Sequence, residues 1–65
     1  MKFSESKDEV FYRFEHPNGF WYELAYVKAQ KRFLAFRCNA FAEDPNWQKM
    51  DASSMLQAEK AFSIG

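Results

Sequence analysis

Short runs of alternating apolar and polar positions fill the middle of the chain, from Val10 to Phe41. They are rich in aromatic and β-branched residues, which fit the pleated, half-buried surface of a β-strand. Polar and turn-forming residues interrupt the pattern twice. It therefore predicts a three-stranded antiparallel β-meander with strands at about 10–15, 20–27 and 33–41.

Near the C-terminus the apolar spacing changes to that of a helix. The apolar residues on one side of this helix are Met55, Ala58, Ala61 and Phe62. Asp51 is a suitable N-cap, and Asp44 followed by Pro45 is an earlier one. We expect a C-terminal helix at about 52–62 that either begins there or starts near 45. In the first case, residues 45–50 form a separate turn or a short strand.

The predicted fold class is α+β, with the helix packed on one face of the sheet. Residues 4–9 are all polar or charged. We therefore expect residues 1–9 to be a frayed polar lead-in to a single small domain that spans 1–65.

The HPNG sequence at residues 16–19 sets the first hairpin. Proline presets its own φ, asparagine tolerates the next position, and glycine takes a left-handed one. The sequence therefore favours a type I turn with a glycine bulge, in which His16 pairs with Phe20. That register places Arg13 opposite Glu23.

The second connection, KAQKR at residues 28–32, contains no glycine, asparagine or proline. Pairing Val27 with Phe33 keeps one face apolar across all three strands and places Arg37 opposite Glu23. A slip of two residues would preserve the faces but break this row of alternating charges.

Side chains alternate between the two faces of a sheet, so these registers sort the apolar residues. Most of them fall on one face, the inner face, which we expect the helix to cover. Its residues are Val10, Tyr12, Phe14, Phe20, Tyr22, Leu24, Tyr26, Leu34, Phe36, Cys38 and Ala40. A domain this small must bury its most extensive apolar surface, so we interpret the inner face as the core.

The opposite, outer face mixes apolar and charged residues. Ala25 and Ala35 form a row with Phe11, and this small-residue centre suits an incoming side chain from a partner or a second copy. The face is either solvated, with scattered apolar residues, or an interface. In the second case, the predicted partner-binding residues are Phe11, Arg13, Trp21, Glu23, Phe33 and Arg37.

Composition narrows the chemistry. Nine Lys and Arg balance nine Asp and Glu, whereas general nucleic-acid binders usually carry a basic excess. Cys38 and His16 are single residues of their kinds, so no internal disulfide forms and a structural zinc site lacks ligands. No nucleophile, base and orienting group share a supporting spacing. We therefore expect no metal, no cofactor and no catalytic residues.

These observations predict a small non-enzymatic protein–protein interaction module that acts through the outer face on another protein or on a second copy in a homodimer. A regulator, an inhibitor or an accessory subunit of phage or mobile-element origin suits this size. The alternative is a nucleic-acid-binding module, in which sheet aromatics stack on bases and the basic turn (Lys28, Lys31 and Arg32) contacts phosphates.

The expected cellular compartment is inferred from the cysteine, from the first residues and from the length of the apolar runs. No apolar run approaches the roughly 18 residues of a membrane span. The first residues turn polar at once, unlike a secretory signal, and the cysteine is unpaired. We therefore expect a cytoplasmic protein without a membrane partner.

Overall fold

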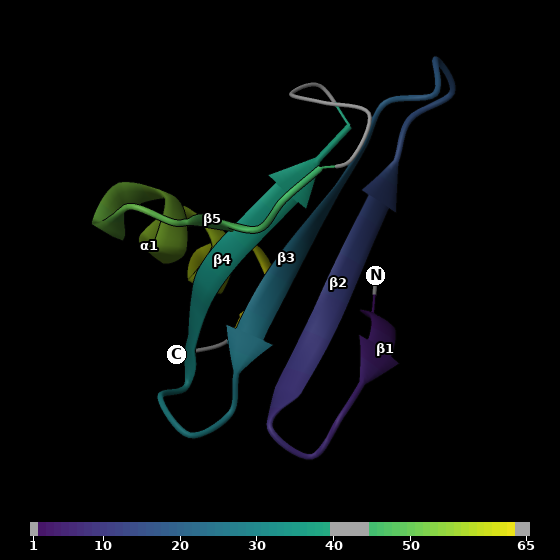
Figure 1. Cartoon of the computed structure of the whole chain (residues 1–65). Coiled ribbons are helices and arrows are strands. Elements are labelled where there is room, and N and C mark those ends of the chain that lie inside the picture. The colour runs from purple at the N-terminus through teal and green to yellow at the C-terminus, as the bar shows by residue number, and fades with distance from the viewer. Residues whose placement is uncertain (1, 40–44, 64–65) are drawn as a thin grey trace.

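The computed structural model describes residues 2–39 and 45–63. Its elements are β1 (Lys2–Glu5), β2 (Glu9–Glu15), β3 (Trp21–Val27), β4 (Arg32–Cys38), β5 (Gln48–Lys49) and α1 (Ala52–Ala61). The strands form one antiparallel sheet in the order β1-β2-β3-β4-β5, and α1 lies behind β4 on one face of it (Figure 1). The predicted α+β class with a C-terminal helix is confirmed. The predicted number of strands is wrong, because the sheet has five strands rather than three.

The two outermost strands, β1 and β5, are the ones that the sequence did not predict as part of the meander. Residues 2–5, expected to be part of a frayed lead-in, pair with β2, and the ladder is irregular at Phe3. In β5, Lys49 pairs with Ala35. Of the structures left open for residues 45–50, a short strand is the one that forms. Neither strand has an alternating apolar pattern. Each therefore depends on pairing with its neighbouring strand rather than on the local propensity of its residues.

The first hairpin has the predicted register along its whole length. The backbone N–H of His16 donates to the carbonyl of Phe20 (2.8 Å), and that of Gly19 donates to His16 (3.0 Å). Gly19 has a φ of 90°, in the region that favours glycine. From this turn the ladder continues to Glu9, and Arg13 lies opposite Glu23.

The second hairpin departs from its predicted register at one residue. Pairs up to Ala25 with Ala35 follow the prediction, but Tyr26 pairs with Phe33 instead of Leu34. Leu34 is thus the extra residue of a β-bulge. The prediction that Phe33 lies on the outer face is wrong, because the bulge reverses the alternation for this residue.

Phe33 lies instead at the centre of the core. It is fully buried, and its ring centroid lies 5.5 Å from Tyr12, 5.3 Å from Tyr26 and 5.6 Å from Phe62. Burying a phenylalanine side chain contributes about 2–3 kcal/mol, which offsets the interrupted ladder at the bulge. The buried core cluster is Leu24, Phe33, Met50 and Ala58.

The helix begins at its predicted cap. Asp51 Oδ1 accepts a hydrogen bond from the backbone N–H of Ser54 (2.7 Å), and this bond lowers the pKa of the Asp51 carboxyl. The described residues 45–51 are not helical, so a start near 45 is wrong, and Asp44 lies outside the described residues. Met55 and Phe62 pack against the core cluster, as the helical spacing predicts.

Two predicted inner-face and strand positions, Ala40 and Phe41, also lie outside the described residues. Within residues 2–39 and 45–63, no helix has the length and apolar character needed to cross a membrane.

Candidate interaction site on the outer face

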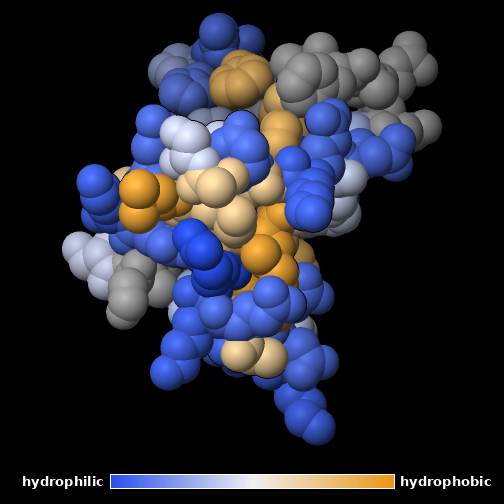
Figure 2. Space-filling model, turned by 90° about the vertical axis from the view of Figure 1, so that its left-hand side faces the viewer, coloured by the Kyte–Doolittle hydropathy of each residue, from blue (hydrophilic) through white to orange (hydrophobic). Residues whose placement is uncertain are grey.

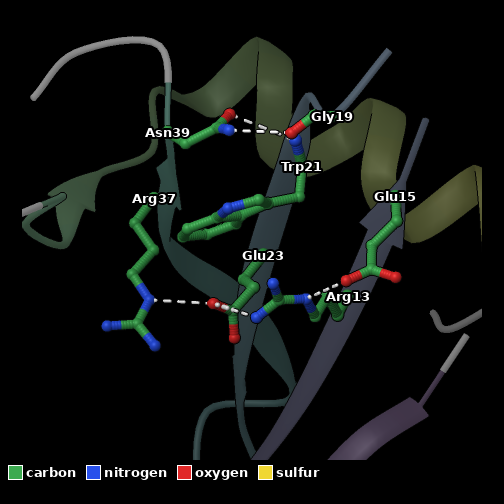
Figure 3. A network of polar contacts seen from close by, with 7 residues as sticks. All are labelled: Arg13, Glu15, Gly19, Trp21, Glu23, Arg37 and Asn39. Carbon is green, nitrogen blue, oxygen red and sulfur yellow. Dashed lines mark hydrogen bonds and ion pairs between the residues drawn. The ribbon is translucent and has the colours of Figure 1, made fainter. Parts of the chain in front are cut away.

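A buried carboxylate organises the outer face. Glu23 is only 2% exposed, and its Oε1 accepts a hydrogen bond from Arg37 Nε (3.0 Å). The same oxygen lies 3.5 Å from Arg13 Nη1, so two guanidinium groups share it (Figure 3). These side chains come from adjacent strands at paired positions, which confirms the predicted row of alternating charge.

Arg13 lies between two aromatic rings. Its Cζ is 4.5 Å from the centroid of the Trp21 ring and 5.2 Å from that of Phe3. Its Nε donates to Glu15 Oε1 (3.0 Å), whose side chain is 69% exposed. The guanidinium is therefore held by stacking and by two carboxylates, which restricts its rotamers.

Arg37 stacks in the same way on Trp47, a residue just before β5. Its Cζ is 4.7 Å from the Trp47 ring centroid, and the Trp47 ring is 5.7 Å from that of Phe11. Phe11 belongs to β2 and Arg37 to β4, so the indole reaches across β3 on the outer face. We call Arg13, Trp21, Glu23, Arg37 and Trp47 the arginine–tryptophan layer.

Asn39 anchors one edge of this layer. Its Oδ1 accepts the backbone N–H of Trp21 (3.1 Å), and its Nδ2 donates to the carbonyl of Gly19 (2.9 Å; Figure 3). The end of β4 is thereby tied to the HPNG turn. This connection fixes the backbone from which Trp21 projects.

Most of the predicted partner-binding residues are brought together in this region. Those on the outer face are Phe11, Arg13, Trp21, Glu23 and Arg37, whereas Phe33 is in the core. The sequence missed Trp47 and Phe3. The available signal for Trp47 was the row of Phe11, Ala25 and Ala35, which was predicted to receive a side chain from outside. The chain's own Trp47 contacts Phe11 in this row, and Ala25 is buried.

A shallow hollow of about 360 Å³ lies beside the layer. It is lined by Lys2, Phe3, Arg13 and Glu15. Two aromatic residues of the outer face, Phe3 in the lining of this hollow and Trp47 against Phe11 and Arg37, are among the most exposed large apolar residues described. The outer face thus combines partly exposed rings with fixed cations.

The alternative prediction of phosphate binding requires the cations of the basic turn to be available, but two of the three make ion pairs within the chain. Lys28 Nζ lies 2.8 Å from Glu5 Oε2, and this bond lowers the pKa of the Glu5 carboxyl. Arg32 Nε lies 2.8 Å from Glu59 Oε1 on α1. Lys31 is exposed, with a left-handed φ of 55°. Two of the three cations therefore tie strands and helix together.

The remaining polar chemistry is sparse in the part of the chain that the structure describes. His16 is an exposed turn residue and Cys38 is a buried thiol. No three His, Cys, Asp or Glu side chains among these residues are arranged to hold a metal ion.

The helix side offers a weaker candidate surface. Two adjoining hollows of about 280 and 450 Å³ lie between α1 and the inner face and share Tyr22, Leu24, Met50 and Ser54. They are lined mostly by residues of the core cluster and by residues packed against it. Figure 2, which shows the molecule from the side of α1 and β5, has apolar side chains in several patches separated by hydrophilic ones.

The comparisons with known proteins add no relative: no family model, no curated protein and no solved structure matches the chain.

Proposed function

We propose that the protein is a small non-enzymatic interaction module, a regulator, inhibitor or accessory subunit, whose arginine–tryptophan layer binds a surface of another protein. Tryptophan and arginine are enriched among the residues that dominate binding energy at protein interfaces. Here two of each lie on the outer face. The observation that carries the proposal is that one buried carboxylate fixes both arginines beside partly exposed indoles.

Fixed side chains favour binding because less rotamer entropy is lost when the partner arrives. Only the exposed part of this network, the Arg13–Glu15 pair, resembles a surface ion pair, which stabilises a fold by about 0–1 kcal/mol. Loss of the buried Glu23, which pairs with both arginines, should cost more. The network therefore stabilises the sheet and also presents two fixed guanidinium groups on an accessible face, as a contact surface requires.

The experiment is capture of a partner with the immobilised chain from extracts of the cells that make it, followed by reconstitution with the purified partner. The dissociation constant is then compared for the wild type, Trp47→Ala and Trp21→Ala. Truncating a dominant interface residue should weaken binding at least about tenfold. Leu56→Ala is the control, because Leu56 is a 50% exposed apolar residue on α1.

Unchanged binding by both tryptophan variants, with each variant still folded, would remove the outer face from the interface. Self-association is examined in the same set by sedimentation. If the partner is a second copy, Trp47→Ala should shift the chain towards monomer while Leu56→Ala does not.

The nucleic-acid alternative gains no favouring observation, because Lys28 and Arg32 make ion pairs within the chain. The alternative stays a prediction, and oligonucleotide binding that weakens as salt is added would support it.

A further inference from the structure

Arg37 has one edge of its guanidinium engaged and another edge exposed. Its Nε donates to Glu23, while no hydrogen bond joins Nη1 or Nη2 to any residue within 2–39 and 45–63. Figure 3 shows the two terminal nitrogens directed away from Glu23. The side chain is 34% exposed, so this edge is accessible to a ligand.

We propose that this edge binds a carboxylate side chain of the partner protein, in a two-point contact next to the Trp47 ring. The proposal rests on the function proposed above and specifies the chemistry of the partner: an acidic residue flanked by an apolar one. A planar guanidinium presents parallel N–H groups at the spacing of the two oxygens of a carboxylate, which a lysine does not.

The geometry prepares Arg37 for this contact. Glu23 holds Nε from one side, and the Trp47 ring lies 4.7 Å from Cζ on another. The cost of immobilising a long side chain is therefore met in the folded chain before any partner binds. Trp47 is itself 39% exposed, which leaves apolar surface for the residue beside the incoming carboxylate.

The charge around Arg37 suits an anion better than the charge around Arg13. Beside Arg13 lies the exposed carboxylate of Glu15, which would repel a partner's acidic group. At the edge of the sheet, β5 carries the exposed Lys49, which pairs with Ala35, two positions from Arg37 along β4. Among residues 2–39 and 45–63, Glu23 is buried beneath the two guanidinium groups, which leaves Arg37 and Lys49 as the accessible charged side chains described at this end.

A protein carboxylate fits this site better than a nucleic-acid backbone. A nucleic acid needs a row of cations, since each neutralised phosphate adds to affinity. The described outer face offers Arg37 and Lys49 at this end, and the chain's formal net charge is zero. By contrast, binding one acidic side chain requires only one guanidinium edge and a neighbouring positive charge.

The probe is the blocked peptide acetyl-Leu-Glu-Leu-amide, titrated into isotopically labelled protein at low ionic strength and followed by NMR. We expect saturable shifts of the Arg37 Nε–H and Trp47 indole N–H signals. The matched peptide acetyl-Leu-Gln-Leu-amide should bind about tenfold more weakly, because the charge-assisted bonds are lost.

Protein variants provide the second arm. Arg37→Gln should remove the preference for the glutamate peptide, and Arg32→Gln should retain it, because Arg32 pairs with Glu59 on α1. Equal binding of the two peptides, or no binding of either, would overturn the carboxylate proposal. The proposal would also be overturned if an oligothymidine shifted the same Arg37 and Trp47 signals and bound the protein more tightly than the glutamate peptide does.

These outcomes are separable from failure of the proposed function. A reconstituted complex that is weakened by Trp47→Ala but unaffected by Arg37→Gln would leave the interface on the outer face and overturn the carboxylate contact alone. Loss of the proposed function would appear instead as insensitivity to Trp21→Ala and Trp47→Ala.

Discussion

The two faces of the sheet are ordered by different forces. The inner face is closed by α1 around the fully buried ring of Phe33, so its order comes from apolar burial. The outer face is ordered by electrostatics and ring stacking around Glu23, while its indoles and guanidinium groups stay partly exposed. Apolar burial explains why the domain folds. Because the ordered side chains of the outer face remain partly exposed, this face is better suited to binding a partner than the inner face is.

The largest expected effect is on the inner face. Phe33→Ala should cost about 3–5 kcal/mol in the free energy of unfolding, because it leaves a large cavity in the core. A domain of this size has only a few kcal/mol of stability, so we expect this variant to be largely unfolded by circular dichroism. Phe3→Ala makes the same change at an exposed position and should cost only about 0.5–1 kcal/mol, from the lost contact with the Arg13 guanidinium. A folded Phe33→Ala protein would contradict the bulged register.

The next effect tests the buried carboxylate. Glu23→Gln should lower the free energy of unfolding by about 2 kcal/mol, because two guanidinium groups lose their shared negative partner. The value is below that of a fully buried pair, since both arginines are partly exposed to solvent.

Glu15→Gln is the matched control, because Glu15 also binds Arg13 but is largely exposed. Urea titration should show a change of about 0.5 kcal/mol or less for this control. Equal effects of the two substitutions would mean that Glu23 does not organise the outer face.

A smaller effect is expected for the ring that crosses β3. Trp47→Ala should cost about 1 kcal/mol, from lost contacts with Phe11 and Arg37. The measurement is the urea midpoint of the variant beside that of Leu56→Ala. If Trp47→Ala unfolds the domain, then Trp47 belongs to the core and the distinction between the two faces fails.

The smallest effect concerns the cap of α1. Asp51→Ala should lower the melting temperature at neutral pH, since Ser54 loses its acceptor. The folded pKa of Asp51 lies below its ordinary value because of that hydrogen bond. The contribution of the carboxylate is therefore complete above the ordinary pKa of about 4, and is lost as pH falls through the lower folded pKa. The gap between wild type and variant should narrow in acid, and a constant gap would contradict this.

How far the sequence predicts the molecule depends on the local signals. The HPNG turn determines the first hairpin completely, because a glycine at positive φ permits one register. The second turn has no such residue, and its left-handed position is taken by Lys31. The register there is set by burial of Phe33, a tertiary effect that a regular alternation cannot reveal.

The candidate site was predictable where strands carry it and not elsewhere. The placement of Arg13, Glu23 and Arg37 in one row follows from the two registers alone. Trp47 stands in a segment without an apolar period, so its contact with Phe11 depends on how the chain returns to β4. The same is true of Phe3, at the irregular point of β1.

The most direct test of the central claim, that the partner binds the outer face, is acrylamide quenching of Trp47 in a Trp21→Phe background. Trp47 is then the single indole in the chain, and it is 39% exposed in the structure. We predict that the reconstituted partner protects this indole, so that the quenching constant falls severalfold on complex formation. A complex that forms with unchanged quenching of Trp47 would contradict the account.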